Sequence, residues 1–138
     1  MTIIITGTST GIGFALAEYF GKKGHKVFGL SRKNVESQYF TTIPTDITDN
    51  LQVQAAISEI LKTESRIDVL INNAGMGMVG AVEDSTKEDI LKLFNLNLVG
   101  AVQMMSAVMP KMREQKLGKI INISSIGSEM GLPFRGFY

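Results

Sequence analysis

The chain has 138 residues, of which 44% are hydrophobic, 14 are basic and 13 are acidic, so its formal net charge at pH 7 is +1. This balance excludes an intrinsically disordered chain and leaves no electrostatic reason to expect nucleic acid or an anionic membrane as a partner. With no cysteine and a single histidine, His25, we also expect no disulfide framework and no metal site.

The first residues, Met1 to Gly13, lack the basic start of a secretory signal peptide. No apolar run reaches the roughly eighteen residues that a membrane span needs. We therefore expect a cytoplasmic protein with one domain over residues 1–138.

The predicted elements begin with a buried strand over Thr2–Thr6. The helix that follows carries apolar residues at helical spacing, namely Ile12, Ala15, Leu16, Tyr19 and Phe20. Gly24 ends this helix. A second strand is predicted over Val27–Ser31 and a third over Phe40–Pro44, where the proline is compatible only with an edge strand.

Asp49 and Gln52 have the pattern of a helix start, and the helix they predict has the apolar face Val53, Ile57, Ile60 and Leu61. The fourth strand is predicted over Ile67–Ile71. Ser85 and Glu88 then form a capping box for a long helix that ends before Gly118.

This long helix, Glu88–Lys116, is apolar nearly all round and is expected to kink at Pro110. One face carries Ile90, Phe94, Asn97 and Ala101. A stripe of apolar residues must be covered by a part of the protein beyond this chain or by a partner subunit, and it consists of Met105, Val108, Met109 and Met112. The last strand is predicted over Lys119–Ser124.

The order of these elements predicts an α/β fold, namely a Rossmann-like doubly wound parallel sheet with strand order 3-2-1-4-5. This order puts Phe40–Pro44 at one edge, as its proline requires. It leaves Lys119–Ser124 at the other edge, although this strand is too apolar for an exposed edge. We therefore expect further helices and strands beyond the end of this chain.

The loop TGTSTGIG, Thr6–Gly13, joins the first strand to the first helix. Its three glycines allow backbone N–H groups to approach a diphosphate, and the helix N-terminus adds its dipole. No lysine follows Gly13, so the loop is not a Walker loop. An ordinary turn between strand and helix is the alternative interpretation.

Three further motifs accompany this loop: NNAG at Asn72–Gly75, NLVG at Asn97–Gly100, and INISS ending at Ser125. Together they resemble the short-chain dehydrogenase/reductase family over the whole chain. The resemblance implies that a dinucleotide is bound by Gly7, Ser9, Thr10, Gly11, Ile12, Gly13, Ser31, Arg32, Asp46, Ile47, Asn73, Ala74 and Gly75.

The resemblance also implies an Asn–Ser–Tyr–Lys active site, which Asn97, Ser125 and Tyr138 match here. The lysine would follow four residues after Tyr138, so we expect this chain to be the N-terminal part of a longer enzyme and to be inactive by itself. Taken singly, Ser125 could end a strand, Asn97 could be a satisfied core amide, and Tyr138 could be a packing aromatic. Their joint spacing favours catalysis.

The implied reaction is hydride transfer between nicotinamide and a carbonyl or alcohol carbon. Tyr138 would act as the acid/base and Ser125 would hold the substrate oxygen. Asn97 is expected to be buried and to bind local backbone and a water in a proton relay. Met76, Met78 and Val79 suggest an apolar wall of the substrate site.

Ser31 and Arg32 favour NADP(H) over NAD(H), because NAD enzymes of this kind carry an acidic residue at the end of the second strand. Arg32 could instead lie in a solvated loop, and Thr10 is neutral where some NADP-preferring relatives are basic. Asp46 resembles an adenine-contacting aspartate, or it is a plain turn residue. Only fourteen residues separate Ser31 from Asp46, too few for a full helix, which leaves the adenosine site more open.

The sequence therefore predicts an NADP(H)-dependent oxidoreductase that acts on a small-molecule carbonyl or alcohol substrate and forms a homodimer or homotetramer. A non-catalytic dinucleotide-binding or regulatory Rossmann protein is the alternative. A Rossmann-fold lyase or epimerase shares the same motifs and is a third interpretation.

Overall fold

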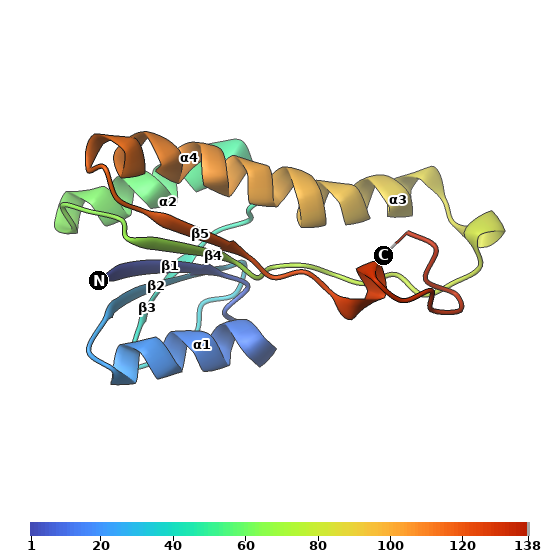
Figure 1. The fold of residues 1–138 in the computed structure, drawn as a ribbon, viewed down its shortest axis with the longest axis horizontal. Helices are drawn as coiled ribbons and strands as arrows, with labels where there is room; N and C mark the ends of the chain where they lie inside the picture. The colour runs from blue at the N-terminus through green and yellow to red at the C-terminus, as the bar shows by residue number, and fades with distance from the viewer. Residues whose placement is uncertain (138) are drawn as a thin grey trace.

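Five parallel strands form one sheet in the order β3-β2-β1-β4-β5 in the computed structural model, which describes residues 1–137 (Figure 1). This confirms the predicted α/β fold and its strand order. The strands are β1 (Thr2–Thr6), β2 (Lys26–Ser31), β3 (Thr41–Pro44), β4 (Val69–Asn72) and β5 (Lys119–Asn122). Strand β1 lies at the centre, is buried along its whole length, and pairs with β2 and β4.

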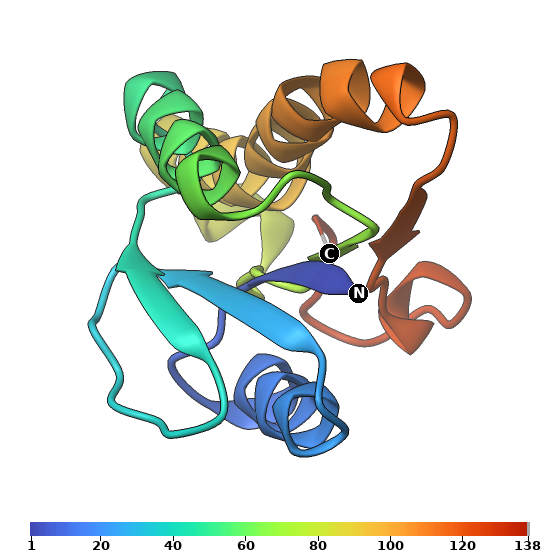
Figure 2. The same ribbon diagram turned by 90° about the vertical axis from the view of Figure 1, so that its left-hand side faces the viewer.

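Helices cover both faces of the sheet, with α1 (Gly11–Lys22) on one face and α2 (Asn50–Thr63) and α4 (Ala101–Glu114) on the other (Figures 1 and 2). The long helix is continuous over Lys87–Glu114. It consists of α3 (Lys87–Phe94), a π-helical stretch η2 (Asn95–Gly100) and α4. Short 3₁₀ turns occur at η1 (Val82–Asp84) and η3 (Ile126–Ser128).

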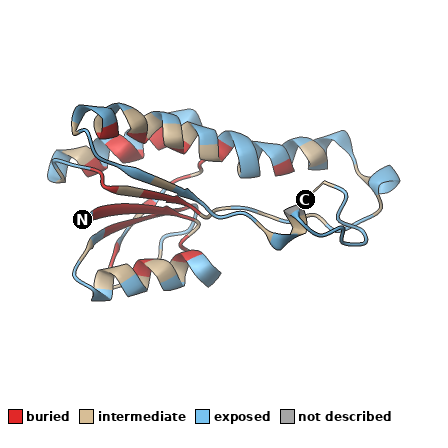
Figure 3. Ribbon diagram, viewed as in Figure 1, coloured by how far each residue is buried: buried red, intermediate tan, exposed pale blue. Residues whose placement is uncertain are grey.

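The core has two halves because successive side chains of a strand point to opposite faces. Ile4 of β1 packs with α2 and α4, whereas Ile3 and Ile5 pack toward α1. Figure 3 shows the buried strands between the partly exposed helices. This double burial explains why β1 is an unbroken run of apolar residues flanked by threonines.

The apolar face predicted for α1 is partly wrong. Ile12 and Tyr19 are 62% and 56% exposed, whereas Gly13 and Ala17 are buried. The small residues let α1 approach the sheet closely, since a Cβ at Gly13 would lie 2.3 Å from the carbonyl oxygen of Gly7. The larger residues that support this contact from its sides are Phe14, Leu16 and Phe20.

Residues 32–40 contain no helix, as the short spacing between β2 and β3 predicted. Phe40 is buried there and Val35 is partly buried, and both pack on the α1 side of the core. The segment lies directly against α1, because a Cβ at Gly21 would meet the carbonyl oxygen of Tyr39. The side chains of Phe40 and Val35 therefore cover the part of the core that a full helix would cover.

Asp49 is the N-cap of α2, as predicted, and accepts hydrogen bonds from the backbone N–H groups of Leu51 and Gln52. The capping box predicted for the long helix is shifted by one residue. The hydroxyl of Thr86 accepts from the N–H of Asp89 at 3.1 Å. Ser85 instead donates to the carbonyl of Ala81, because the sequence offers two overlapping boxes and only one matches the first helical turn.

Three of the four residues in the predicted apolar stripe of the long helix pack in the core of the described chain, so for these three the expectation that a further segment or a partner subunit covers them is wrong. Val108 and Met112 are buried in the core with Met104, and Met105 packs against them. The helix continues through Pro110 to Glu114. Its exposed apolar residues lie nearer the N-terminal end, at Leu91, Phe94, Leu98, Val99 and Val102.

Lys87–Glu114 is the one helix within residues 1–137 that is long and apolar enough, by length and composition alone, to cross a membrane. This corrects the expectation that no stretch reaches that length. Its C-terminal part packs on the sheet through Met104, Val108 and Met112, as a core helix does. Ile121 of the edge strand β5 and Ile123, which directly follows this strand, are each 43% exposed.

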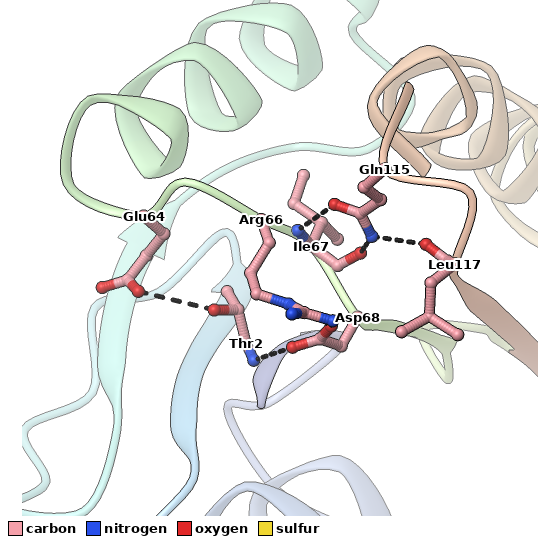
Figure 4. Close-up of polar contacts among 7 residues, drawn as sticks. All are labelled: Thr2, Glu64, Arg66, Ile67, Asp68, Gln115 and Leu117. Atoms are coloured by element: carbon pink, nitrogen blue, oxygen red, sulfur yellow. Dashed lines mark hydrogen bonds and ion pairs between the residues drawn. The ribbon is translucent and has the colours of Figure 1, made fainter. Parts of the chain in front are cut away.

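Polar side chains form a hydrogen-bonded network at the end of the sheet where β1 and β4 begin (Figure 4). The N–H of Thr2 donates to Asp68 Oδ2 at 2.7 Å, and Arg66 Nε donates to Asp68 Oδ1 at 2.6 Å. Gln115 accepts from the N–H of Ile67 and donates to its carbonyl, so the end of α4 is joined to the start of β4. These groups satisfy backbone atoms that the ends of the strands leave unpaired.

Candidate functional site

The carboxyl ends of β1, β2 and β4 meet at one edge of the sheet, where two adjoining clefts open. The first has a volume of about 260 Å³. It is lined by most of the residues predicted to bind the dinucleotide, namely Gly7, Ser9, Thr10, Ser31, Arg32, Asp46, Ile47, Asn73, Ala74 and Gly75. The structure therefore brings residues from four separate loops, which follow β1, β2, β3 and β4, into one site.

Gly11, Ile12 and Gly13 do not line this first cleft. Gly13 is buried beneath the loop, Gly11 begins α1, and Ile12 lines the second cleft. Gly7 and Gly11 have φ angles of 73° and 61°, which favour glycine. A Cβ at Gly7 would lie 2.8 Å from the Cα of Ala74, so only glycine allows the two loops to approach this closely.

The N-terminus of α1 is suited to an anion. Thr10 is its N-cap residue but makes no side-chain capping hydrogen bond, and the first turn has no acidic residue. Backbone N–H groups and the positive end of the helix dipole are thus left for a ligand beside Ser9 and Thr10, which line the cleft. These features match the diphosphate of a dinucleotide.

Thr6 joins the glycine loop to the NNAG segment, a role that the sequence analysis missed. Its hydroxyl accepts from the N–H groups of Asn73 and Ala74, both at 3.0 Å. Asn73 Nδ2 returns hydrogen bonds to the carbonyls of Thr6 at 2.9 Å and Gly7 at 3.3 Å. A threonine directly after three isoleucines at the end of a buried strand was the available signal.

Arg32 and Ser31 differ in what they can offer a phosphate. Ser31 is buried, and its hydroxyl donates to the carbonyl of Lys33 at 2.7 Å. Arg32 is exposed, lines the cleft, and forms no ion pair with another residue that the structure describes. Arg32 is therefore the cationic group at the end of β2.

Asp46 also lines the first cleft, and it makes hydrogen bonds within its own turn. Its Oδ1 accepts from the N–H of Thr48 at 2.9 Å and from the hydroxyl of Thr48 at 2.7 Å. This geometry is that of a turn residue, which was the alternative to adenine contact. Both roles are compatible, because these bonds use only one carboxylate oxygen.

The second cleft, of about 980 Å³, contains Asn97 and Ser125 and shares Asn73, Ala74 and Gly75 with the first. Its other lining residues are mostly apolar, namely Ile12, Met76, Gly77, Leu93, Phe94, Leu98, Ile123, Ser124, Ile126 and Phe137. Met76 is thus part of an apolar wall, as predicted, whereas Met78 and Val79 do not line this cleft.

Asn97 is exposed, which corrects the prediction that its amide is buried. It binds local backbone, as expected: Asn97 Nδ2 donates to the carbonyl of Met76 at 2.8 Å, and the N–H of Met76 donates to Asn97 Oδ1 at 2.9 Å. Phe94, which lies on the same predicted face before the π-helical stretch, is also 47% exposed, and both residues line the second cleft, so this face of the helix borders the cleft and not the core.

Ser125 follows β5 and is the N-cap of η3, where its hydroxyl accepts from the N–H of Gly127 at 3.1 Å. It lies in the same cleft as Asn97. The third predicted catalytic residue, Tyr138, lies outside the described residues. Among residues 1–137 there is no group of three or more histidine, aspartate or glutamate side chains that could hold a metal ion.

Comparison with known proteins identifies the family. The model of the short chain dehydrogenase family matches residues 1–138. The chain belongs to this family. A curated short-chain dehydrogenase relative, 3-ketodihydrosphingosine reductase of Bacteroides thetaiotaomicron, is 46% identical over 137 residues, which are 99% of this chain and 51% of the relative. The chain thus spans about half the length of the curated relatives it matches.

Solved structures of similar proteins have the same fold. Aldohexose dehydrogenase of Thermoplasma acidophilum superposes with a TM-score of 0.93 at 34% identity, covering 99% of this chain and 54% of that one. The structure of ElxO with NADP bound gives a TM-score of 0.90 at 32% identity, covering 97% and 59%. The glycine loop and the two clefts therefore lie in the fold of the short-chain dehydrogenase family.

Proposed function

We propose that the whole protein is an NADP(H)-dependent oxidoreductase that transfers a hydride between nicotinamide and a carbonyl or alcohol carbon. The observation that carries the proposal is that the two clefts share Asn73, Ala74 and Gly75. A dinucleotide held by its diphosphate at α1 can extend past Gly75, so that its reactive end lies in the cleft that contains Asn97 and Ser125.

The residues of this chain would then orient the substrate and move a proton. Ser125 would donate to the substrate oxygen, and Tyr138 would exchange a proton with that oxygen. Asn97 would hold the loop at Met76 through its two hydrogen bonds and so shape the cleft. The cofactor, when bound, supplies or accepts the hydride.

The apolar lining of the second cleft supports a substrate with a long aliphatic chain. The cleft is lined by apolar side chains from several elements, including Leu93, Leu98 and Ile123. The relative that is 46% identical is named for its action on 3-ketodihydrosphingosine, a ketone on a long chain. We infer that this protein reduces a carbonyl group on a comparable apolar substrate.

The test is loss of NADPH absorbance with a panel of ketones and aldehydes that runs from short polar compounds to 3-ketodihydrosphingosine. Turnover that increases with the length of the aliphatic chain is expected. Tight NADPH binding without turnover of any carbonyl or alcohol would favour a regulatory dinucleotide-binding protein instead.

Arg32→Ala is expected to remove most of the preference for NADPH. The unaltered whole protein should bind NADPH at least about tenfold more tightly than NADH, a difference of about 1.4 kcal/mol, because the exposed guanidinium can pair with the 2′-phosphate. Kd values from NADPH and NADH fluorescence check this. Lys33→Ala is the matched control, since Lys33 is exposed but does not line the cleft. Equal affinities for the two cofactors in the unaltered protein would contradict the assignment.

We also propose that the whole protein is a cytoplasmic homodimer or homotetramer. The apolar residues that the long helix leaves exposed support this, since a surface stripe of this kind is commonly covered in an assembly. Light scattering on the whole protein should give a mass of two or four chains. A monomer at all concentrations would contradict the proposal.

A further inference from the structure

Asn72 lies where three elements of the site meet. It is the last residue of β4, is 5% exposed, and directly precedes the cofactor segment Asn73–Gly75. Asn72 Nδ2 donates to Asn122 Oδ1 at 2.8 Å and lies 3.5 Å from the carbonyl oxygen of Ala101. One amide therefore contacts β5, which leads to Ser125, and the start of α4, which follows the π-helical stretch with Asn97.

The direction of these hydrogen bonds is determined by their partners. Because the carbonyl of Ala101 can only accept, the group that faces it must be the Nδ2 donor of Asn72. Asn122, the register partner of Asn72 in β5, must then present its oxygen. The Oδ1 of Asn72 is buried without a hydrogen-bond partner among the described residues, so only the donor side of this amide makes contacts.

We propose that Asn72 is a positioning residue that sets the distance between Ser125 and Asn97 across the second cleft. The Nδ2 group of Asn72 contacts both the end of β5, at Asn122, and the first carbonyl of α4, at Ala101. Asn72 itself directly precedes the cofactor segment. A small displacement of catalytic groups lowers turnover strongly even when the fold persists. This role rests on the proposed oxidoreductase function.

Replacing Asn72 by aspartate distinguishes a role of Asn72 in hydrogen bonding from a role in packing alone. Asn72→Asp has nearly the same shape, but its ionised carboxylate cannot donate and would face two acceptor oxygens. Its protonated form regains one donor. In contrast, Asn122→Asp preserves the bond, because a carboxylate at Asn122 still accepts from Asn72 Nδ2.

The experiment measures kcat and KM of the whole protein with NADPH and 3-ketodihydrosphingosine, or with the best substrate of the panel, over a range of pH. In Asn72→Asp, kcat should fall roughly tenfold to a hundredfold at neutral pH while KM for NADPH changes little. The kcat of Asn72→Asp, divided by the kcat of the unaltered protein, should rise again as the pH is lowered. Asn122→Asp should lose less and show no such recovery.

Asn122→Leu gives an independent test if Asn72→Asp does not fold, because it removes the acceptor of this hydrogen bond and leaves Asn72 unchanged. Removal of this acceptor should lower kcat at every pH, with no recovery in acid. A ratio that is flat with pH for Asn72→Asp, or full activity of Asn122→Leu, would overturn the positioning role. If the unaltered whole protein turned over no substrate, the proposed function itself would fail, and this role would fail with it.

Discussion

Ser125→Ala is expected to lower turnover of the whole protein by about 10²–10³, the usual effect of removing one donor to a reacting oxygen. The hydroxyl of Ser125 lies in the cleft that also contains Asn97, and the N–H of Gly127 holds it there at 3.1 Å. Because Ser125 lies outside the first cleft, the affinity for NADPH should change little. Steady-state kinetics and a separate NADPH titration check both expectations.

Ser124→Ala is the matched control, since Ser124 lines the same cleft but was assigned to the end of the strand. It should retain most of the turnover. A loss of turnover in Ser124→Ala equal to that in Ser125→Ala would contradict the assignment of Ser125.

Tyr138→Phe in the whole protein should lower turnover by several orders of magnitude. The 138-residue chain alone should bind NADPH weakly and turn over no carbonyl substrate.

Asp68→Asn is expected to lower the free energy of unfolding by about 1–3 kcal/mol at neutral pH, because it weakens hydrogen bonds to a buried charged group. Asp68 is 6% exposed. Burial raises the pKa of this carboxyl, but the N–H of Thr2 and the guanidinium of Arg66 outweigh burial and hold the pKa below its ordinary value. The ionised carboxylate is therefore the form that stabilises the fold.

The pH dependence follows from the direction of this shift. Since the pKa of Asp68 is lower in the folded than in the unfolded chain, its stabilisation is complete above the unfolded pKa of about 4. It is lost as the pH falls through the folded pKa. Urea unfolding of the unaltered chain and of Asp68→Asn should therefore differ most at neutral pH and converge in acid.

Glu114→Gln provides the control for the stability prediction. Glu114 forms a surface ion pair with Lys111 at 3.0 Å, and its side chain is 70% exposed. Solvent screens such a pair, so the variant should change stability little at any pH. A stability difference between Asp68→Asn and the unaltered chain that stays the same from acid to neutral pH would show that Asp68 acts by packing alone.

The order of the sheet could be predicted from the sequence because it depends on local patterns. Short apolar runs alternate with helical ones, and parallel strands joined by right-handed crossovers leave few topologies. The proline at the end of Thr41–Pro44 selected the edge, and the spacing of Ser31 and Asp46 excluded a helix between them. Asp49 was recognised as a cap because its partners, Leu51 and Gln52, are its neighbours in the sequence.

The sequence by itself thus determined the fold class, the glycine loop and which residue types gather at the carboxyl edge of the sheet. The tertiary structure decided what each of them contacts. The sequence carries no local signal for the π-helical stretch at Asn95–Gly100, and none for the close approach of Gly13 to Gly7, beside which Ile12 is exposed. The bonds of Thr6 to the NNAG segment and of Asn72 to Asn122 join residues 50 or more positions apart. Such contacts depend on how whole elements pack, and periodicity describes only one element at a time.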